Sequence, residues 1–466
     1  MEPAPMPSEQ YWSATMSFLD EDIVAVFERI FHRATSKHTF DLPDGAAFQT
    51  VSPDSTRLAY GVPDRKGAHV AVNGQRGRSF DTVAGITFSK DSRHVAYAAM
   101  RGGQWCAVFN DREYELWDEI GVTSPVISPD GLHVAYSARR GRHWFVVKDG
   151  MTVGGPYNGI VPGGIVFSPD SQRMAYGVID NGGQCLVTDG IPAQVFCCLM
   201  TGTWTFSPDS KVVAYVAGVS GASRDHVFVG ESAVVMNSDV LQAWPHDGNK
   251  GLGVGAEVYF SPNSKRHAYT VAHESGGVIV VDGTRGPGYD EKVGAFREFP
   301  KCQDYLGYGK AGWKDHGVEF SPDSDHYAYA ARNEKNATVF LDGEPHWTGE
   351  RILSSGMLFS NDAQRLAFGA EAEDGSQFMV VDRVPQKRFY GLPPSRKSFS
   401  PDSRRIAYFA SDGRSTLLVI DSEVRRVPGV IPAGSRILWD GPEQLHTLVA
   451  RGRSISLTRF AVGSGD

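Results

Sequence analysis

The 466-residue sequence has no long apolar run and no strong excess of basic charge. No stretch of about 18 consecutive apolar residues occurs, which argues against a helix that crosses a membrane. The 46 basic and 54 acidic residues leave a formal net charge of −8, which argues against nucleic acid as the main partner because phosphate backbones attract basic surfaces. The start, MEPAPMPSEQ, has neither a basic nor an apolar segment, so we expect no secretory signal.

Cysteine is scarce and unpatterned. The five residues Cys106, Cys185, Cys197, Cys198 and Cys302 contain no Cys-x-x-Cys pair and no spacing typical of a disulfide framework. Reduced, mostly buried thiols are the expectation, and with them a cytoplasmic location.

Familiar catalytic motifs are missing too. The sequence contains no G-x-S-x-G nucleophile elbow, no H-E-x-x-H and no P-loop. Its 14 histidines are scattered, and His94, His133, His267 and His326 are expected to pack in the fold or lie at the surface. No cluster of acidic or histidine residues stands out, so we expect no catalytic residue, no metal site and no cofactor.

What the chain does contain is a repeat. Nine segments share an apolar anchor, a turn close to Ser-Pro-Asp-Ser, and an Ala-Tyr pair. They run Val51–Tyr60, Phe88–Tyr97, Ile127–Tyr136, Phe167–Tyr176, Phe206–Tyr215, Phe260–Tyr269, Phe320–Tyr329, Phe359–Phe368 and Phe399–Tyr408. The turn Asp, which is Asn263 in the sixth copy, recurs after 37, 39, 40, 39, 54, 60, 39 and 40 residues, and a degenerate tenth copy ends at Asp440. Such regularity indicates a repeat architecture.

Each copy has the pattern of four short strands. In the fourth copy we expect strands over 164–167, 172–178, 185–190 and 193–197, separated by turn residues. With 52 glycines and 11% aromatics, the chain is poor in helix formers and rich in turn formers. Four strands in about 40 residues are typical of a β-propeller blade.

The repeated turn and pair serve structure in this interpretation. A turn Asp in every copy favours a capping role over metal binding, because a metal site needs several side chains that converge on one point. The Ala-Tyr pairs are expected to pack between blades. The pattern FSPDS-x-x-x-AY, followed by an Asp-Gly strand end such as Val278–Gly283, resembles the Pro-Asp class of WD-like repeats in TolB-like and dipeptidyl-peptidase-like propellers. That resemblance implies the fold and leaves the function open.

The ends of the chain are predicted to meet. An aromatic residue, a polar residue and then an aliphatic one mark the fourth strand at Phe80–Val83, Trp117–Ile120 and Tyr157–Ile160, and Phe40–Leu42 is similar. The tenth copy offers only three strands, so we expect Phe40–Leu42 to pair with Ser454–Val462 and remove an open edge. Residues 38–466 then form one ring of about ten blades. Two smaller rings or an open arc remain alternatives, since propellers usually have four to eight blades.

Residues 1–37 differ from the repeats. Asp20, Glu21 and Asp22 precede an apolar stripe that predicts an amphipathic helix to about Ala34. Its acidic balance disfavours an anionic membrane. Packing on the propeller is one reading of this helix, and docking to a partner is the other.

Two copies are longer than the rest, and both surpluses are expected between the fourth strand of one blade and the first strand of the next. These connections hold the predicted binding residues Trp244, His246, Asp247, Lys250, Tyr305, Tyr308, Lys310, Trp313, Lys314 and His316. We expect 241–255 and 297–317 to lie side by side on one face, where aromatic and charged residues suit recognition of a protein or peptide. Decorative or mutually packed loops are the alternative.

The sequence therefore favours a non-enzymatic interaction scaffold. The alternative function is a hydrolase or lyase that acts on a small molecule or glycan at the channel mouth. An enzyme should place ionisable groups with strongly perturbed pKa values at one end of the channel. A sensor region of a larger signalling system is a third possibility.

Overall fold

The computed structural model describes residues 39–462, apart from 44, 66, 124, 181, 219–230, 238, 246–253, 274–275, 287–317, 333–335 and 394–396. The predicted helix before residue 35 lies outside these residues. All regular structure in the described part is β-strand. That part contains no helix of the length and hydrophobicity needed to cross a membrane.

The described strands form ten antiparallel sheets, numbered here from 1 to 10 in chain order. Sheets 1 to 3 are β2 (Ala47–Val51), β3 (Leu58–Asp64), β4 (Gly67–Val72) and β5 (Gln75–Phe80); β6 (Thr82–Phe88), β7 (Val95–Arg101), β8 (Gln104–Phe109) and β9 (Arg112–Glu113); and β10 (Glu119–Ile120), β11 (Val126–Ile127), β12 (Val134–Arg140), β13 (His143–Lys148) and β14 (Met151–Tyr157).

Sheets 4 to 6 are β15 (Gly159–Phe167), β16 (Met174–Asp180), β17 (Gly183–Thr188) and β18 (Ile191–Pro192); β19 (Cys198–Leu199), β20 (Thr205–Phe206), β21 (Val213–Gly218), β22 (Glu231–Met236) and β23 (Asp239–Pro245); and β24 (Val254–Phe260), β25 (His267–His273), β26 (Gly276–Val281) and β27 (Thr284–Arg285).

Sheets 7 to 10 are β28 (Glu319–Phe320), β29 (Tyr327–Arg332), β30 (Ala337–Leu341) and β31 (Glu344–Gly349); β32 (Arg351–Phe359), β33 (Leu366–Glu371), β34 (Gln377–Val381) and β35 (Val384–Phe389); β36 (Lys397–Phe399), β37 (Ile406–Ser411), β38 (Thr416–Ile420) and β39 (Glu423–Arg426); and β40 (Leu438–Gly441), β41 (Gln444–Arg451) and β42 (Ser454–Ala461) with β1 (Thr39–Asp41).

Each sequence repeat corresponds to one sheet. In sheet 4 the apolar anchor Phe167 ends the first strand, and Tyr176 lies in the second. The first strand begins at Gly159, earlier than the predicted residue 164, because Gly159 and Ile160 already pair with β16 before a register shift. The four-stranded antiparallel architecture is that of a β-propeller.

The aromatic-polar-aliphatic mark has a different place from the predicted one. Phe80 ends β5 of sheet 1, whereas Val83 lies in β6 of sheet 2. The mark therefore spans the passage from a fourth strand to the next first strand, and does not lie wholly within strand four. Its polar residue caps a neighbouring hairpin: the Asp81 carboxylate accepts a hydrogen bond from the Gly102 backbone N–H at 2.6 Å.

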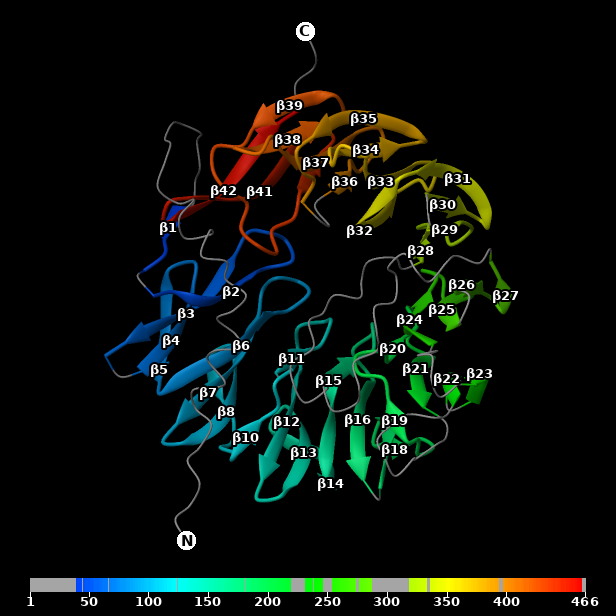
Figure 1. The fold of residues 1–466 in the computed structure, drawn as a ribbon. Coiled ribbons are helices and arrows are strands. Elements are labelled where there is room, and N and C mark those ends of the chain that lie inside the picture. The colour runs from blue at the N-terminus through cyan, green and yellow to red at the C-terminus, as the bar shows by residue number, and fades with distance from the viewer. Residues whose placement is uncertain are drawn as a thin grey trace.

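The predicted packing role of the repeated tyrosines is confirmed. Tyr97 of sheet 2 lies in a buried cluster with Val70 and Phe80 of sheet 1, and Tyr136 of sheet 3 lies in one with Ala98 of sheet 2. Similar clusters join every later pair of successive sheets. Figure 1 shows the result: first strands lie toward the middle of the molecule and fourth strands at its rim.

The last sheet also packs against the first. Leu448 and Ile455 of sheet 10 share a buried cluster with Leu58 and Tyr60 of sheet 1. The predicted pairing of the chain ends is confirmed, since Phe40 of β1 lies opposite Ile455 of β42. The order of sheet-to-sheet packing is thus cyclic within the described residues.

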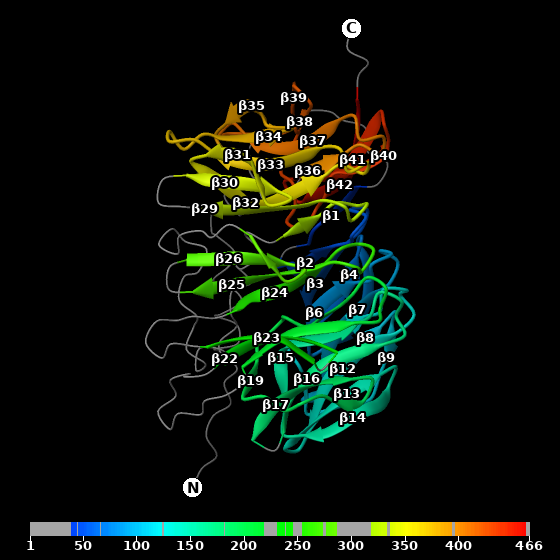
Figure 2. The ribbon, with the colours of Figure 1, turned by 90° about the vertical axis from the view of Figure 1, so that its right-hand side faces the viewer.

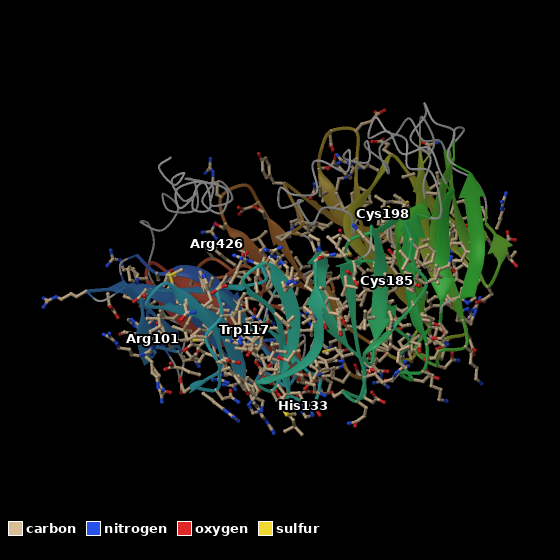
Figure 3. All side chains as sticks on the ribbon, turned by 90° about the horizontal axis from the view of Figure 1, so that it is seen from below. Arg101, Trp117, His133, Cys185, Cys198 and Arg426 are labelled. Carbon is tan, nitrogen blue, oxygen red and sulfur yellow. The ribbon has the colours of Figure 1, made fainter. Side chains whose placement is uncertain are left out.

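Antiparallel pairing gives the molecule two different faces. Turns between first and second strands, and between third and fourth strands, lie at one end of each sheet; we call this end the turn face. Links between second and third strands, and from a fourth strand to the next sheet, lie at the other, the connection face. Figure 2 shows strands that run from one face to the other. In Figure 3, His133 lies at the lower edge and Cys198 on the opposite side.

Candidate functional site

The repeated Ser-Pro-Asp-Ser turns are hydrogen-bonded units on the turn face. In sheet 4 the Ser168 hydroxyl donates to the Asp170 carboxylate at 2.5 Å and accepts from the Arg173 backbone N–H at 2.9 Å. The same carboxylate accepts from the Gln172 N–H at 3.0 Å. The predicted capping role of the turn Asp is therefore confirmed. Among the described residues no three His, Cys, Asp or Glu side chains are grouped closely enough to hold a metal ion.

These hydrogen bonds hold the turn carboxylates in their charged form. The pKa lies below its ordinary value of 3.8 at six turns, chiefly because the first Ser hydroxyl donates to the carboxylate; these are Asp91, Asp170, Asp209, Asp323, Asp362 and Asp402. The negative charge of each carboxylate therefore strengthens the hydrogen bonds within its own turn.

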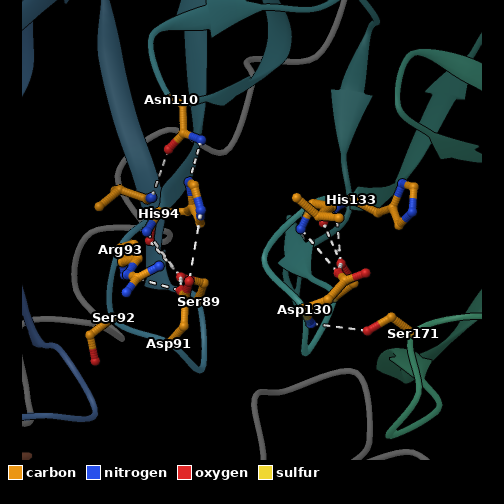
Figure 4. Close-up of polar contacts among 12 residues, drawn as sticks. Ser89, Asp91, Ser92, Arg93, His94, Asn110, Asp130, His133 and Ser171 are labelled. Carbon is orange, nitrogen blue, oxygen red and sulfur yellow. Dashed lines mark hydrogen bonds and ion pairs between the residues drawn. The ribbon is translucent and has the colours of Figure 1, made fainter.

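The second Ser of the turn links neighbouring sheets, which the sequence analysis missed. Ser171 of sheet 4 is buried and left-handed, with φ 65°, and its hydroxyl accepts from the Asp130 backbone N–H of sheet 3 at 3.0 Å (Figure 4). Equivalent bonds reach Ser92, Ser210, Ser264, Ser324 and Ser403. Between sheets 10 and 1, the Arg436 backbone N–H donates to the Ser55 hydroxyl at 2.8 Å. Gly131 and Ala363 occupy this position in two sheets and have no hydroxyl.

An arginine three residues after the turn Asp adds further contacts between the same neighbouring sheets. Arg173 pairs with Asp189 at 2.8 Å, donates to the Ser210 carbonyl of the next sheet at 2.9 Å and stacks over Phe206 of that sheet. Arg57, Arg266 and Arg365 also stack over a phenylalanine of the following sheet. These contacts stabilise the turn face.

Histidine replaces this arginine in other sheets. His133 lies 2.7 Å from Asp149 and His326 lies 2.6 Å from Asp342. The hydrogen bond to Asp342 raises the pKa of His326. Burial lowers the pKa of His267, which stacks on Tyr269. All three histidines have structural partners in their own sheets.

A cavity of about 270 Å³ opens between sheets 7 and 8, where Ala363 replaces the turn Ser. Its lining includes His326, His346, Arg365 and Arg383. His346 Nδ1 accepts from Arg383 Nε at 3.3 Å, and burial, with the nearby Arg383 charge, lowers the pKa of this imidazole. The lining also includes the Asp382 carboxylate, which pairs with Arg365 at 2.8 Å, and apolar side chains such as Phe359.

The predicted binding residues fall almost entirely outside the described part of the chain. The residues not described are His246, Asp247, Lys250, Tyr305, Tyr308, Lys310, Trp313, Lys314 and His316. The backbone of Trp244 lies in β23, opposite Ser232 of β22. The proposed binding surface therefore stays a prediction.

The placement of the first surplus was partly wrong. Twelve residues, 219–230, separate β21 from β22, and only eight, 246–253, separate β23 from β24. Much of this surplus lies between the second and third strands. The sequence analysis took Gly230 as the end of strand three, whereas Asn237, with φ 46°, occupies that turn. Its side-chain oxygen accepts a hydrogen bond from the Val213 backbone N–H at 3.0 Å. The Asp189 carboxylate accepts from the Met174 N–H in the same way in sheet 4.

The second surplus lies where it was predicted. Residues 286–318 separate β27, a fourth strand, from β28, the first strand of the next sheet. Glu319 begins β28, and Lys397 begins the first strand of sheet 9.

Glu319 of β28 and Lys397 of β36 both have pKa values shifted toward neutrality, and the charge of each acts on the pKa of the other. Burial lowers the pKa of Lys397 to about 8, against the opposing effect of Glu319. Desolvation raises the pKa of Glu319, although this residue keeps an exposed surface. The Lys397 ammonium donates to the Gly356 carbonyl of sheet 8 at 2.8 Å. First strands surround the middle of the molecule (Figure 1), which places both residues on its inner strands.

Comparison with known proteins gives likeness only to solved structures. A crystal structure of a eukaryotic initiation factor is 10% identical, with a TM-score of 0.45 over 78% of this chain and 92% of that one. The Dos1 propeller is 12% identical, with a TM-score of 0.35 over 72% and 91%. The tricorn protease is 12% identical, with a TM-score of 0.28 over 83% and 44%. No protein-family model and no curated protein matches the chain.

Proposed function

We propose that the ten sheets are the blades of one closed β-propeller that acts as a non-enzymatic interaction scaffold in the cytoplasm. Support for a single ring comes from the cyclic order of the buried clusters, which includes the seam between sheets 10 and 1. The hydrogen-bonded β1–β42 pairing also supports closure, because the first strand of the chain completes the last sheet.

The partner in this proposal is a protein or peptide. The observation that carries it is topological: the connections 246–253 and 286–318 both leave a fourth strand, at Pro245 and Arg285, and both enter the next first strand. They belong to successive sheets and start from the same face. Trp244 lies in β23 directly before the first connection, and the second connection contains Tyr305 and Trp313. Large aromatic side chains contribute much binding energy at interfaces.

Affinity capture with variants tests this function. Intact protein and a Trp244→Ala/Trp313→Ala variant would be used as bait under identical conditions, with retained proteins quantified by mass spectrometry. The control is Met151→Ala/Ile191→Ala, which removes exposed apolar side chains at turns between third and fourth strands. A partner retained by the intact and control baits and lost from the Trp variant supports the proposal. Equal retention by all three baits contradicts it.

A hydrolase or lyase that acts on a small molecule or glycan is the second candidate. The Glu319–Lys397 pair favours it, because a lysine with a pKa of about 8 can act as a base near neutral pH. Chromogenic esters and glycosides are suitable probes. Turnover by the intact protein that disappears in Lys397→Met and in Glu319→Gln would support this function. Turnover that survives both substitutions would assign the activity elsewhere or to a contaminant.

A further inference from the structure

The adjacent residues Cys197 and Cys198 lie at a repeated position of the fold. The Cys197 backbone N–H donates to the Gly218 carbonyl at 3.2 Å, as Asp81 donates to Met100 and Asp118 to Arg139. These bonds join the passage between two sheets to the end of a second strand. Cys197 therefore occupies the place at which two earlier passages have an aspartate.

In those two sheets the side chain at this place is a hydrogen-bonded carboxylate. The Asp81 carboxylate accepts from Gly102 N–H at 2.6 Å, and the Asp118 carboxylate accepts from Gly141 N–H at 2.7 Å. Both donors begin the link between a second and a third strand on the connection face. At Cys197 the residue equivalent to these donors lies outside the described residues, and the Cys197 thiol donates to the Gly218 carbonyl at 3.3 Å. Cysteine is nucleophilic as the thiolate, which forms when this thiol loses its proton.

The two sulfur atoms lie close together, and both lie next to Gly218. Cys197 Sγ lies 3.9 Å from Cys198 Sγ. A Cβ atom at Gly218 would lie 2.8 Å from the first sulfur and 2.9 Å from the second. Both distances are too short for any side chain, so glycine at this position leaves room for the two sulfurs. Cys197 is exposed and Cys198 half-buried, which gives a reagent access.

The electrostatics agree with this geometry. The hydrogen-bonded contact with the Cys198 sulfur, together with backbone N–H groups, lowers the pKa of Cys197 to about 7 against the effect of burial. Burial instead raises the pKa of Cys106 to about 11 and also raises that of Cys185. Both of those thiols are buried. Among the four described cysteines, Cys197 and Cys198 thus lie close together and accessible, whereas Cys106 and Cys185 are shielded.

We propose that Cys197 and Cys198 form a covalent modification site that reacts with hydroperoxides, with Cys197 as the attacking residue and Cys198 as the resolving residue. The Cys197 thiolate attacks the peroxide ROOH; the O–O bond breaks, one proton is taken up, and sulfenic acid and ROH form. The Cys198 thiol then attacks the sulfenic sulfur, and a disulfide and water form. The two thiols lose two electrons in total, and the peroxide gains them.

A disulfide between neighbouring residues has a short span between its Cα atoms, which makes it easy to reduce. The site is therefore reversible: a small dithiol reductant restores both thiols. Reaction also replaces the anion at this position with a neutral disulfide. The modification would change the charge of the connection face beside the link between β21 and β22.

The test uses the full-length reduced protein, hydrogen peroxide at pH 7 and peptide mapping that reports each cysteine separately, Cys302 included. The expected product is an internal Cys197–Cys198 disulfide that forms at least tenfold faster than oxidation of Cys106 or Cys185. In Cys198→Ser, a sulfenic acid should accumulate on Cys197 and be trapped by a cyclic diketone. In Cys197→Ser, fast oxidation should disappear. Cys185→Ser is the control and should behave as the unaltered protein does.

A pH profile separates activation from simple exposure. The rate of Cys197 alkylation should rise with a midpoint near pH 7, and Cys198→Ala should move this midpoint upward because it removes the hydrogen-bonding partner of Cys197. Reduction with a dithiol should restore the original mass. Fast oxidation in Cys197→Ser, a midpoint near that of ordinary cysteine, or a peroxide product located mainly at another cysteine would each overturn the proposal.

Discussion

Closure of the ring can be tested at the seam between sheets 10 and 1. Leu448 has no exposed surface and packs in the cluster that joins this seam. Leu418 is equally buried and packs in the cluster that joins sheets 9 and 10. Replacement of either leucine by alanine removes the same atoms. The two variants therefore compare a seam between sequence neighbours with the seam that connects the two ends of the chain.

Both substitutions should have similar costs if the ring is closed in solution. A fully buried Leu→Ala change lowers the free energy of unfolding by about 3 kcal/mol, within the range of 2 to 5 kcal/mol for such sites. In a chain of this length we expect each kcal/mol to lower Tm by roughly 1–2 °C, below the figure for domains of 150–250 residues. The expected fall is then roughly 3–6 °C for each variant.

Calorimetry measures Tm, and hydrogen exchange locates the effect. Leu448→Ala should speed amide exchange in β41, β42 and β3, whereas Leu418→Ala should speed it in β38 and β41. In repeat proteins each unit contacts mainly its neighbours, so each effect should stay near its own seam. A loss below about 1 kcal/mol for Leu448→Ala, beside the full loss for Leu418→Ala, would refute closure at this seam.

Three further outcomes are expected. Ser171→Ala leaves the Asp130 N–H without its inter-sheet acceptor and should lower the free energy of unfolding by about 1–3 kcal/mol. Ala363→Ser should raise it, because the substitution restores a hydroxyl at the equivalent turn. Chemical denaturation measures both, and a Ser171→Ala variant as stable as the parent would contradict the role of this serine. Trp244→Ala or Trp313→Ala should weaken partner capture by about 2 kcal/mol or more with little change in Tm; a collapse of Tm would make these residues structural. The turn carboxylates have lowered pKa values, so their stabilising effect is present above pH 3.8 and is lost as the pH falls through the lowered values. Unfolding followed by circular dichroism from pH 6 to pH 2 should show this loss of stability. A free energy of unfolding that does not change with acid would refute the prediction.

Local chemistry made the sheets predictable from the sequence. A Pro-Asp turn, an alternating strand and an Asp-Gly turn each act within a few residues, and so the second and third strands of sheet 4 could be placed to within two positions. The first strand begins five residues earlier than predicted, and β18 covers Ile191–Pro192 in place of the predicted 193–197. The same logic predicted that Phe40–Leu42 would complete the last sheet, because a repeat with three strands leaves one edge open. The ten predicted binding residues are a different case: their role depends on a partner, which no pattern of the chain identifies.

Contacts between repeats required the tertiary structure. The second turn Ser reads as a simple turn residue, yet the hydroxyl of Ser171 binds a backbone N–H that lies 41 residues away. The end of the third strand in sheet 5 was missed, because Asn237 stands there in place of the expected Asp-Gly pair. As a result, part of the extra length of this repeat lies between its second and third strands. Cys197 resembles an ordinary thiol in the sequence, and only the register of β19 against β21 aligns it with aspartates of other sheets. The sequence thus determined the strands and turns, which form from neighbours along the chain. The tertiary structure decided how repeats about 40 residues apart combine side chains into seams and sites.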